Sequence, residues 1–107
     1  APDPTERAPQ QPALTRAVVD LNDRRYVLDG PSAVLGRSDA AACVLRDPNV
    51  SRRHAELRQD ASGQWEIVDL GSTNGVKVNG RRVTDAPLRE GDQVTVGTTT
   101  FRFGIER

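Results

Sequence analysis

Hydrophobic residues alternate with polar ones along most of this chain, and this alternation constrains the fold more than any other feature. It recurs in five short runs: Val19 and Leu21, Tyr26 and Leu28, Trp65 and Ile67, Val94 and Val96, and Phe101, Phe103 and Ile105. A period of two is that of a β-strand with one buried face. No segment sustains a helical period over ten residues. The sequence therefore predicts an all-β domain.

Turn-forming residues separate the alternating runs. Asn79-Gly80, within KVNGRRV, predicts a two-residue hairpin because both central residues of a type I′ turn need positive φ. Similar pairs include Asp29-Gly30, Ser62-Gly63 and Glu90-Gly91. Strands spaced roughly eight to twelve residues apart predict a β-sandwich or barrel. In such folds the loops at one end commonly carry the binding residues.

Length and composition indicate one domain preceded by a tail. The chain has 107 residues, of which 36% are hydrophobic, and this is enough for one modest core. Residues 1–13 hold four of the seven prolines and no large apolar side chain. We predict that they form a disordered Pro-rich linker or tail and that residues 14–107 form the domain. We expect this domain to be the C-terminal module of a longer protein.

Charge and cysteine content exclude several classes of protein. The 15 basic and 15 acidic residues cancel, so no overall field attracts nucleic acid, and we predict no nucleic-acid partner. No apolar run approaches the roughly eighteen residues of a membrane span, so we predict a soluble domain without membrane insertion. Cys43 is the single cysteine and fits a reducing, cytoplasmic location.

Three loop segments together carry the side chains of an anion receptor. VLGRSD delivers Arg37 directly after Gly36, PNVSRRH carries Ser51 and Arg52, and DLGSTNG ends a strand with small polar residues. They supply guanidinium groups, hydroxyls, an amide and the backbone N–H groups of a Gly- and Asn-rich turn. Such donors suit a phosphate group.

These motifs resemble a known family. GR at 36–37, SRRH at 51–54, GSTNG at 71–75 and NG at 79–80, in this order and spacing, resemble the forkhead-associated (FHA) domain. The resemblance covers roughly Leu14 to Ile105. It implies an FHA-type β-sandwich of two antiparallel sheets that binds phosphothreonine peptides with the loops at one end.

The resemblance also implies roles for individual residues. Arg37 bonds the phosphate directly, Ser51 donates its hydroxyl, Thr73 adds a hydroxyl or its backbone, and Arg52 faces the phosphate or the peptide. Asn74 holds the peptide main chain. The residues with architectural roles are Gly36, His54, Gly75, Asn79 and Gly80, and His54 ties the second loop to its neighbour. The candidates for peptide selectivity are Asn49, Thr98 and Thr99.

Two departures from the family pattern bear on selectivity. Val76 follows Asn74-Gly75 where threonine is common in the family, and residues 40–42 are three alanines that make the segment after Arg37 blander than usual. Neither departure affects the proposed phosphate contacts. Both therefore concern which peptide side chains the domain prefers.

The predicted function is that of a non-enzymatic adaptor without a cofactor. It docks onto a phosphothreonine in a Ser/Thr kinase, a pseudokinase or a substrate, as such modules do in high-GC bacteria. The alternative is a scaffold that binds a partner through another face of the sandwich without phosphate. The tail is interpreted as an inert linker; in the alternative, a phosphorylated Thr5 occupies the domain's own site, and Thr15 is a second threonine in this region.

Other interpretations of single residues are weaker. Ser51, His54 and Asp69 could form a hydrolytic triad, but GxSxG is absent. One His and one Cys are too few for a metal site. Cys43, Trp65 and Tyr26 are interpreted as packing residues. The pairs Arg81-Arg82 and Arg24-Arg25 are interpreted as solvated strand or turn residues rather than as a second anion site.

Overall fold

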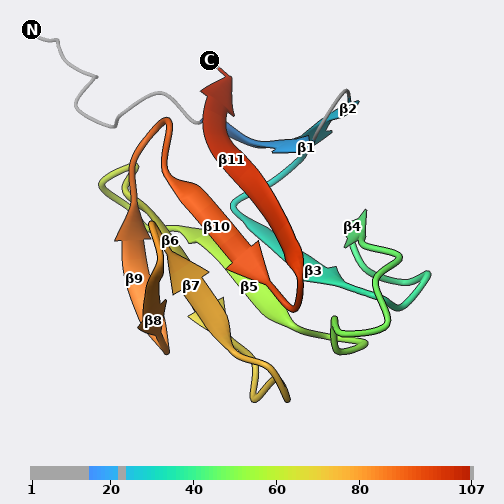
Figure 1. The fold of residues 1–107 in the computed structure, drawn as a ribbon. Helices are drawn as coiled ribbons and strands as arrows, with labels where there is room; N and C mark the ends of the chain where they lie inside the picture. Colours follow the sequence, from blue (N-terminus) through green and yellow to red (C-terminus); the bar gives the residue numbers. More distant parts are fainter. Residues whose placement is uncertain (1–14, 22–23, 107) are drawn as a thin grey trace, which may run out of the picture.

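The computed structural model describes residues 15–21 and 24–106, and within them every regular element is a β-strand (Figure 1). The predicted tail, residues 1–13 with Thr5, lies outside the described residues. The strands are β1 (Arg16–Leu21), β2 (Arg24–Leu28), β3 (Ser32–Gly36), β4 (Cys43–Val44), β5 (Ala55–Gln59), β6 (Trp65–Asp69), β7 (Val76–Val78), β8 (Arg81–Val83), β9 (Asp85–Leu88), β10 (Gln93–Val96) and β11 (Thr99–Glu106). In the described part of the chain, no helix is long and apolar enough to cross a membrane.

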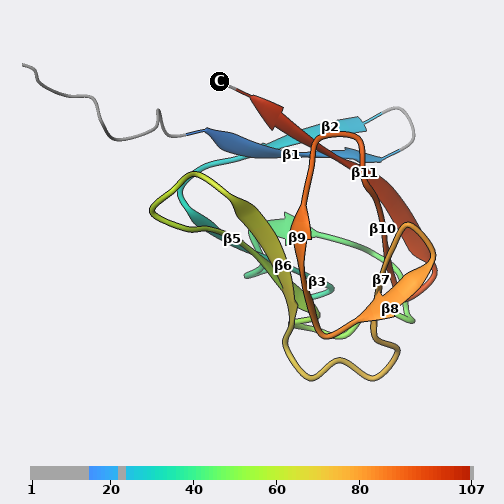
Figure 2. The same ribbon diagram turned by 90° about the vertical axis from the view of Figure 1, so that its left-hand side faces the viewer.

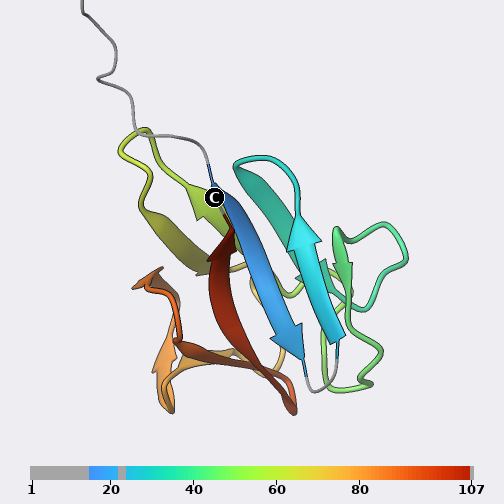
Figure 3. The ribbon, with the colours of Figure 1, turned by 90° about the horizontal axis from the view of Figure 1, so that it is seen from above.

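The strands form two sheets that face each other (Figure 2). One sheet has the order β2-β1-β11-β10-β7-β8 and the other β4-β3-β5-β6-β9. Figure 3 shows β1 between β2 and β11, as this order requires. The predicted β-sandwich is confirmed. Its neighbouring strands are antiparallel except β3 and β4, which pair in parallel through Leu35 and Cys43 because residues 37–42 loop out before the chain returns.

The inward faces of the two sheets form a single hydrophobic core. Trp65 from one sheet and Phe103 from the other meet edge to face, with ring centroids 6.2 Å apart and an interplanar angle of 62°. Trp65 and Cys43 are each 1% exposed, so their interpretation as packing residues is confirmed. Burial raises the pKa of the Cys43 thiol to about 11, so this cysteine is not a reactive thiolate.

The predicted Asn79-Gly80 hairpin is present between β7 and β8. Asn79 has a φ of 52° and Gly80 a φ of 82°, and the strands pair with Val78 opposite Arg81. Both central residues thus adopt the left-handed conformation that a type I′ turn requires. Asn79 also donates from its side-chain amide to Asp92 at 3.1 Å, which anchors the hairpin to the turn before β10.

The loops that carry the predicted site gather at one end of the sandwich. In Figure 1 the loops after β4 and β6 lie at the lower end, the loop after β3 lies to the right above them, and the C-terminal end of β11 lies at the upper end. The fold therefore places the three loop segments together.

Thr15, which precedes β1, is bound to the folded domain. Its hydroxyl accepts hydrogen bonds from Trp65 Nε1 and Gln59 Nε2, each at 2.9 Å.

Candidate anion-binding site

The end of β3 is fixed against the second loop, and this contact positions Arg37. The Arg37 N–H donates to the Ser51 carbonyl at 3.0 Å, and the Ser38 N–H donates to the Arg52 carbonyl at 3.2 Å. A Cβ at Gly36 would lie 2.0 Å from the Arg52 carbonyl oxygen. Only glycine therefore allows the two backbones to approach this closely.

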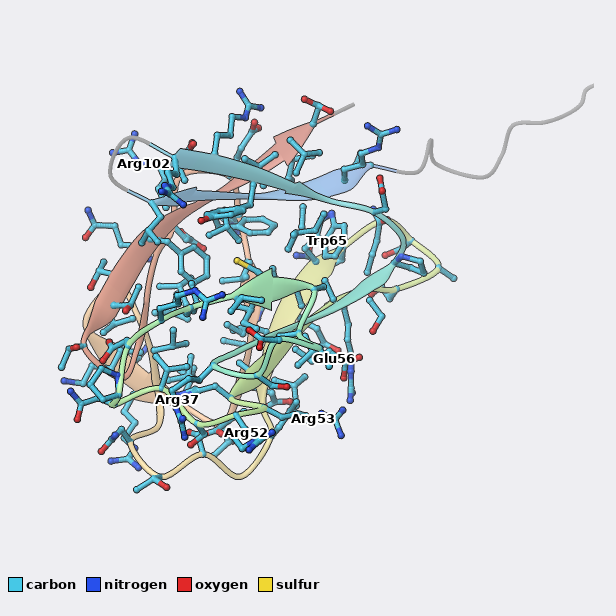
Figure 4. The ribbon with its side chains drawn as sticks, turned by 90° about the vertical axis from the view of Figure 1, so that its right-hand side faces the viewer. Arg37, Arg52, Arg53, Glu56, Trp65 and Arg102 are labelled. Atoms are coloured by element: carbon cyan, nitrogen blue, oxygen red, sulfur yellow. The ribbon has the colours of Figure 1, made fainter. Side chains whose placement is uncertain are left out.

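One of the three nitrogens of the Arg37 guanidinium is bonded within the protein, and the other two are available to a ligand. Its Nε donates to the Val50 carbonyl at 3.0 Å, and this bond orients the planar group. The side chain is exposed, and its two terminal nitrogens make no hydrogen bond or ion pair with a described residue. Figure 4 shows Arg37 and Arg52 at the same end of the molecule. Arg52 is also exposed and has no side-chain partner within the described ranges.

The third loop brings Thr73 to Ser51. The Ser72 N–H donates to Asp69 Oδ1 at 2.8 Å, and the Gly75 N–H donates to Ser72 Oγ at 2.9 Å, so the loop is held by its own side chains. The Thr73 N–H then donates to Ser51 Oγ at 3.1 Å. Because this oxygen accepts, the Ser51 hydroxyl proton remains to be donated to a ligand.

Asn74 joins the second and third loops. Its side-chain Nδ2 donates to the Asn49 carbonyl at 2.7 Å. The residue is exposed, and its Oδ1 makes no hydrogen bond with the described part of the protein. An amide fixed in this way presents a carbonyl oxygen that can accept from a peptide N–H, as the predicted main-chain contact requires.

His54 is fully buried and makes four hydrogen bonds. Its backbone N–H donates to the Leu35 carbonyl at 2.9 Å, and its backbone carbonyl accepts from the Leu70 N–H at 3.0 Å. Its Nδ1 accepts from the Ser51 N–H at 3.0 Å, so Nε2 carries the ring proton and donates to the Gly75 carbonyl at 2.7 Å. These bonds connect β3 and the two loops, which is the geometry that a bracing role requires.

The same bonds disfavour the hydrolytic triad. His54 Nδ1 and Nε2 are both engaged by backbone groups, and neither ring nitrogen faces the Ser51 hydroxyl. The Asp69 carboxylate accepts from the Ser72 N–H instead of the imidazole. A triad needs a base that contacts the nucleophile and an acid that orients the base. The described geometry provides neither contact.

Asp47 is a site residue that the sequence analysis missed. The residue is 9% exposed. Oδ2 accepts from the hydroxyls of Thr98 and Thr99 at 2.6 and 2.7 Å and from the Thr98 N–H at 3.1 Å, and Oδ1 accepts from the Asn49 N–H at 2.9 Å. The hydrogen bond from the Thr98 hydroxyl is the main cause that holds the Asp47 pKa well below its usual range. Asp47 thereby fixes the β10–β11 turn to the second loop.

We expect Asp47→Asn to lower the free energy of unfolding at pH 7, because an amide nitrogen cannot accept from these donors. The folded-state pKa of Asp47 lies below the unfolded value of about 3.9, so the stabilisation is complete above that value and is lost as the pH falls further. Urea denaturation at pH 7, 4 and 3 should show the difference between wild type and variant shrinking below about pH 4.

Asp39→Asn is the matched control, because that carboxylate is exposed and, among the described residues, its only charged partner is Arg46 at 3.4 Å. It should change stability little at any pH. A difference between wild type and Asp47→Asn that is constant from pH 7 to pH 3 would contradict the role assigned to the Asp47 charge.

The three selectivity candidates divide between two roles. Asn49 and Thr98 line a pocket of about 210 Å³ together with Asn74. Thr99 does not line this pocket. The hydroxyls of Thr98 and Thr99 both donate to Asp47, so their direct structural role is to hold the loop. Peptide selectivity at these positions stays a prediction.

Together, the fold and the site define a β-sandwich whose loops at one end present hydrogen-bond donors suited to an anion. The FHA domain family matches residues 33–97 of this chain. This range includes all three loops of the site. The chain belongs to the FHA domain family, and the predicted resemblance is confirmed.

Relatives and solved structures agree with this assignment. The glycogen accumulation regulator GarA of Mycolicibacterium smegmatis is 44% identical over 79 residues, which are 74% of this chain and 49% of GarA. A structure from an analysis of phosphothreonine-dependent FHA domain interactions has a TM-score of 0.78 and 34% identity, covering 86% of this chain and 98% of its own. The FhaA FHA domain, solved in complex with the intracellular domain of Rv3910, has a TM-score of 0.74 and 36% identity, covering 81% and 98%. The chain spans about half the length of the curated relatives it matches.

Proposed function

We propose that this domain is a phosphothreonine-binding adaptor of Ser/Thr kinase signalling that docks onto a phosphorylated kinase, pseudokinase or substrate. It recognises its partner without catalysing a reaction on it. Arg37, Ser51, Arg52 and Thr73 bind the phosphate, and Asn74 holds the peptide main chain. We also propose that the domain is located in the cytoplasm.

One observation carries the proposal. Oriented donors converge at one end of the sandwich with no acceptor among the described residues: the terminal nitrogens of Arg37 and the hydroxyl proton of Ser51. Hydrogen bonds to a charged group contribute about 1.5–3 kcal/mol each. A phosphothreonine carries a charge of roughly −1.5 to −2 at pH 7 and three acceptor oxygens, so it matches this set of donors.

The relatives support the same chemistry. FHA domain interactions that depend on phosphothreonine are described for one structural neighbour, and another neighbour forms a complex with the intracellular domain of Rv3910. Names such as glycogen accumulation regulator and oxoglutarate dehydrogenase inhibitor describe regulators. They favour a regulatory, non-enzymatic role for this chain as well.

We expect the domain to bind a degenerate phosphothreonine peptide library and to ignore the same library without phosphate. Binding to a phosphoserine library should be weaker. Fluorescence polarisation with the three libraries measures this directly. Binding to none of them, together with capture of a partner that phosphatase treatment does not release, would overturn the proposal in favour of a phosphate-independent scaffold that uses another face.

A further inference from the structure

Two positive charges lie directly opposite each other beside the proposed site. Lys77 on β7 pairs with Arg82 on β8, and both side chains are exposed on the outer face of their sheet. Like charges at directly opposed positions destabilise a strand pair. Within the described ranges neither side chain forms an ion pair with a carboxylate. Nothing described in the fold therefore compensates this arrangement.

Protection of a sheet edge explains the arginines of β8 but not the lysine of β7. Charged residues on an edge strand prevent pairing with other chains, and β8 is the edge of its sheet, which accounts for Arg81 and Arg82. Lys77 is different, because β7 pairs with β10 on one side and with β8 on the other. Its charge does not guard an edge.

The position of Lys77 relates it to the site. It lines the pocket of about 210 Å³, whose lining residues are Asn49, Asn74, Gly75, Lys77, Thr95, Gly97 and Thr98. Arg82 does not line this pocket but lies beside its lining residue Gly75, since a Cβ at Gly75 would lie 2.9 Å from Arg82 Nε and from Arg82 Nη2. The carbonyl of the same Gly75 accepts a hydrogen bond from His54 Nε2, so Arg82 lies beside a residue that holds the loops together.

The other groups at this pocket leave the two charges uncompensated. The pocket-lining side chains other than Lys77 are neutral. The carboxylate of Asp47 contacts the lining residues Asn49 and Thr98, and it is already engaged by hydrogen bonds from them and from Thr99. A ligand group at the pocket therefore meets one cation in the lining, Lys77, and a second, Arg82, beside the lining residue Gly75.

We propose that Lys77 and Arg82 form a second anion subsite, adjoining the phosphothreonine site, for an acidic side chain or a second phosphate on the same peptide. This inference rests on the proposed function, because the peptide must first be held at its phosphothreonine. The sequence alone favours a solvated Arg81-Arg82 pair. What the structure adds is the exposed position of Lys77 and Arg82 and the pocket that Lys77 shares with Asn49 and Asn74.

The test starts from the tightest phosphothreonine peptide of the library, with its acidic residues replaced by glutamine. A single glutamate is then placed at each position from four before to four after the phosphothreonine, and a second series carries phosphoserine. Both series are titrated against wild type and against the Lys77→Gln/Arg82→Gln variant. Arg102→Gln is the matched control, since Arg102 is also exposed on β11 of the same sheet but lies at the end opposite Arg37 (Figure 4).

We expect glutamate at one position, or at two adjacent ones, to raise affinity about two- to fivefold, as an exposed charge pair does, and phosphoserine to raise it further. The gain should disappear in the double variant and persist in Arg102→Gln. A gain from phosphoserine alone narrows the subsite to a phosphate. No gain at any position, or a gain that survives in the double variant, overturns the subsite. If the parent peptide still binds in that case, the proposed function stands; if no phosphothreonine peptide binds, both fail.

Discussion

Replacing Arg37 with alanine is expected to weaken phosphothreonine-peptide binding about ten- to a hundredfold. The substitution removes at least one hydrogen bond to a doubly charged group, which contributes about 1.5–3 kcal/mol. It also removes the 3.0 Å hydrogen bond from Arg37 Nε to the Val50 carbonyl, which orients the guanidinium. Isothermal titration with one phosphothreonine peptide measures the change in dissociation constant.

Two further variants separate the chemistry of Arg37 from its charge. Arg37→Lys keeps the charge but loses the planar pair of donors, so it should fall between wild type and Arg37→Ala. Arg102→Ala removes one positive charge from the other end of the sandwich and should bind as wild type does (Figure 4). An unchanged dissociation constant for a folded Arg37→Ala protein would remove Arg37 from the phosphate site.

The architecture could be predicted because its signals are local. Alternation at Trp65 and Ile67, or at Val94 and Val96, marks one buried face of a strand, and each of these residues is buried at the core. The Asn79-Gly80 pair predicts its hairpin from the turn alone, because both residues adopt the positive φ that this turn requires. Alternation fails at Val18 and Val19, which are both buried although adjacent residues of a strand point to opposite faces.

The site could be predicted only in part because some of its contacts join distant residues. Arg37 and Ser51 stand out through the motifs that contain them. Asp47 does not, because Asp47-Pro48 is explained locally as a turn, and its partners Thr98 and Thr99 follow 51 and 52 residues later. The pairing of Lys77 with Arg82 is different, because the predicted two-residue turn at Asn79-Gly80 already fixes the register of β7 with β8. What stays hidden in the sequence is that Lys77 shares a pocket with Asn49 and Asn74. One sequence without its fold gives no signal for such contacts.

Gly36→Ala should impair both folding and binding, since the new methyl group has no room. Its Cβ would lie 2.0 Å from the Arg52 carbonyl oxygen, an atom of the backbone that cannot rotate away. Overpacking of this kind costs typically about 1–3 kcal/mol, which for a domain of this size lowers the melting temperature by about 5–20 °C. The displaced backbone also carries the bonds from the N–H groups of Arg37 and Ser38, so peptide affinity should fall at least about tenfold.

Gly104→Ala is the matched control because it also adds a methyl group to a glycine that lies in a strand without a positive φ. There the Cβ would lie 3.3 Å from Val18 Cβ, a contact that a shift of a few tenths of an ångström relieves. It should lower the melting temperature less than Gly36→Ala does and leave peptide affinity unchanged, since β11 reaches this position at the end away from the site. Thermal melting and peptide titration of both variants give the comparison. Equal losses of affinity would mean that binding follows global stability, whereas a loss confined to Gly36→Ala ties it to the close approach of β3 and the second loop.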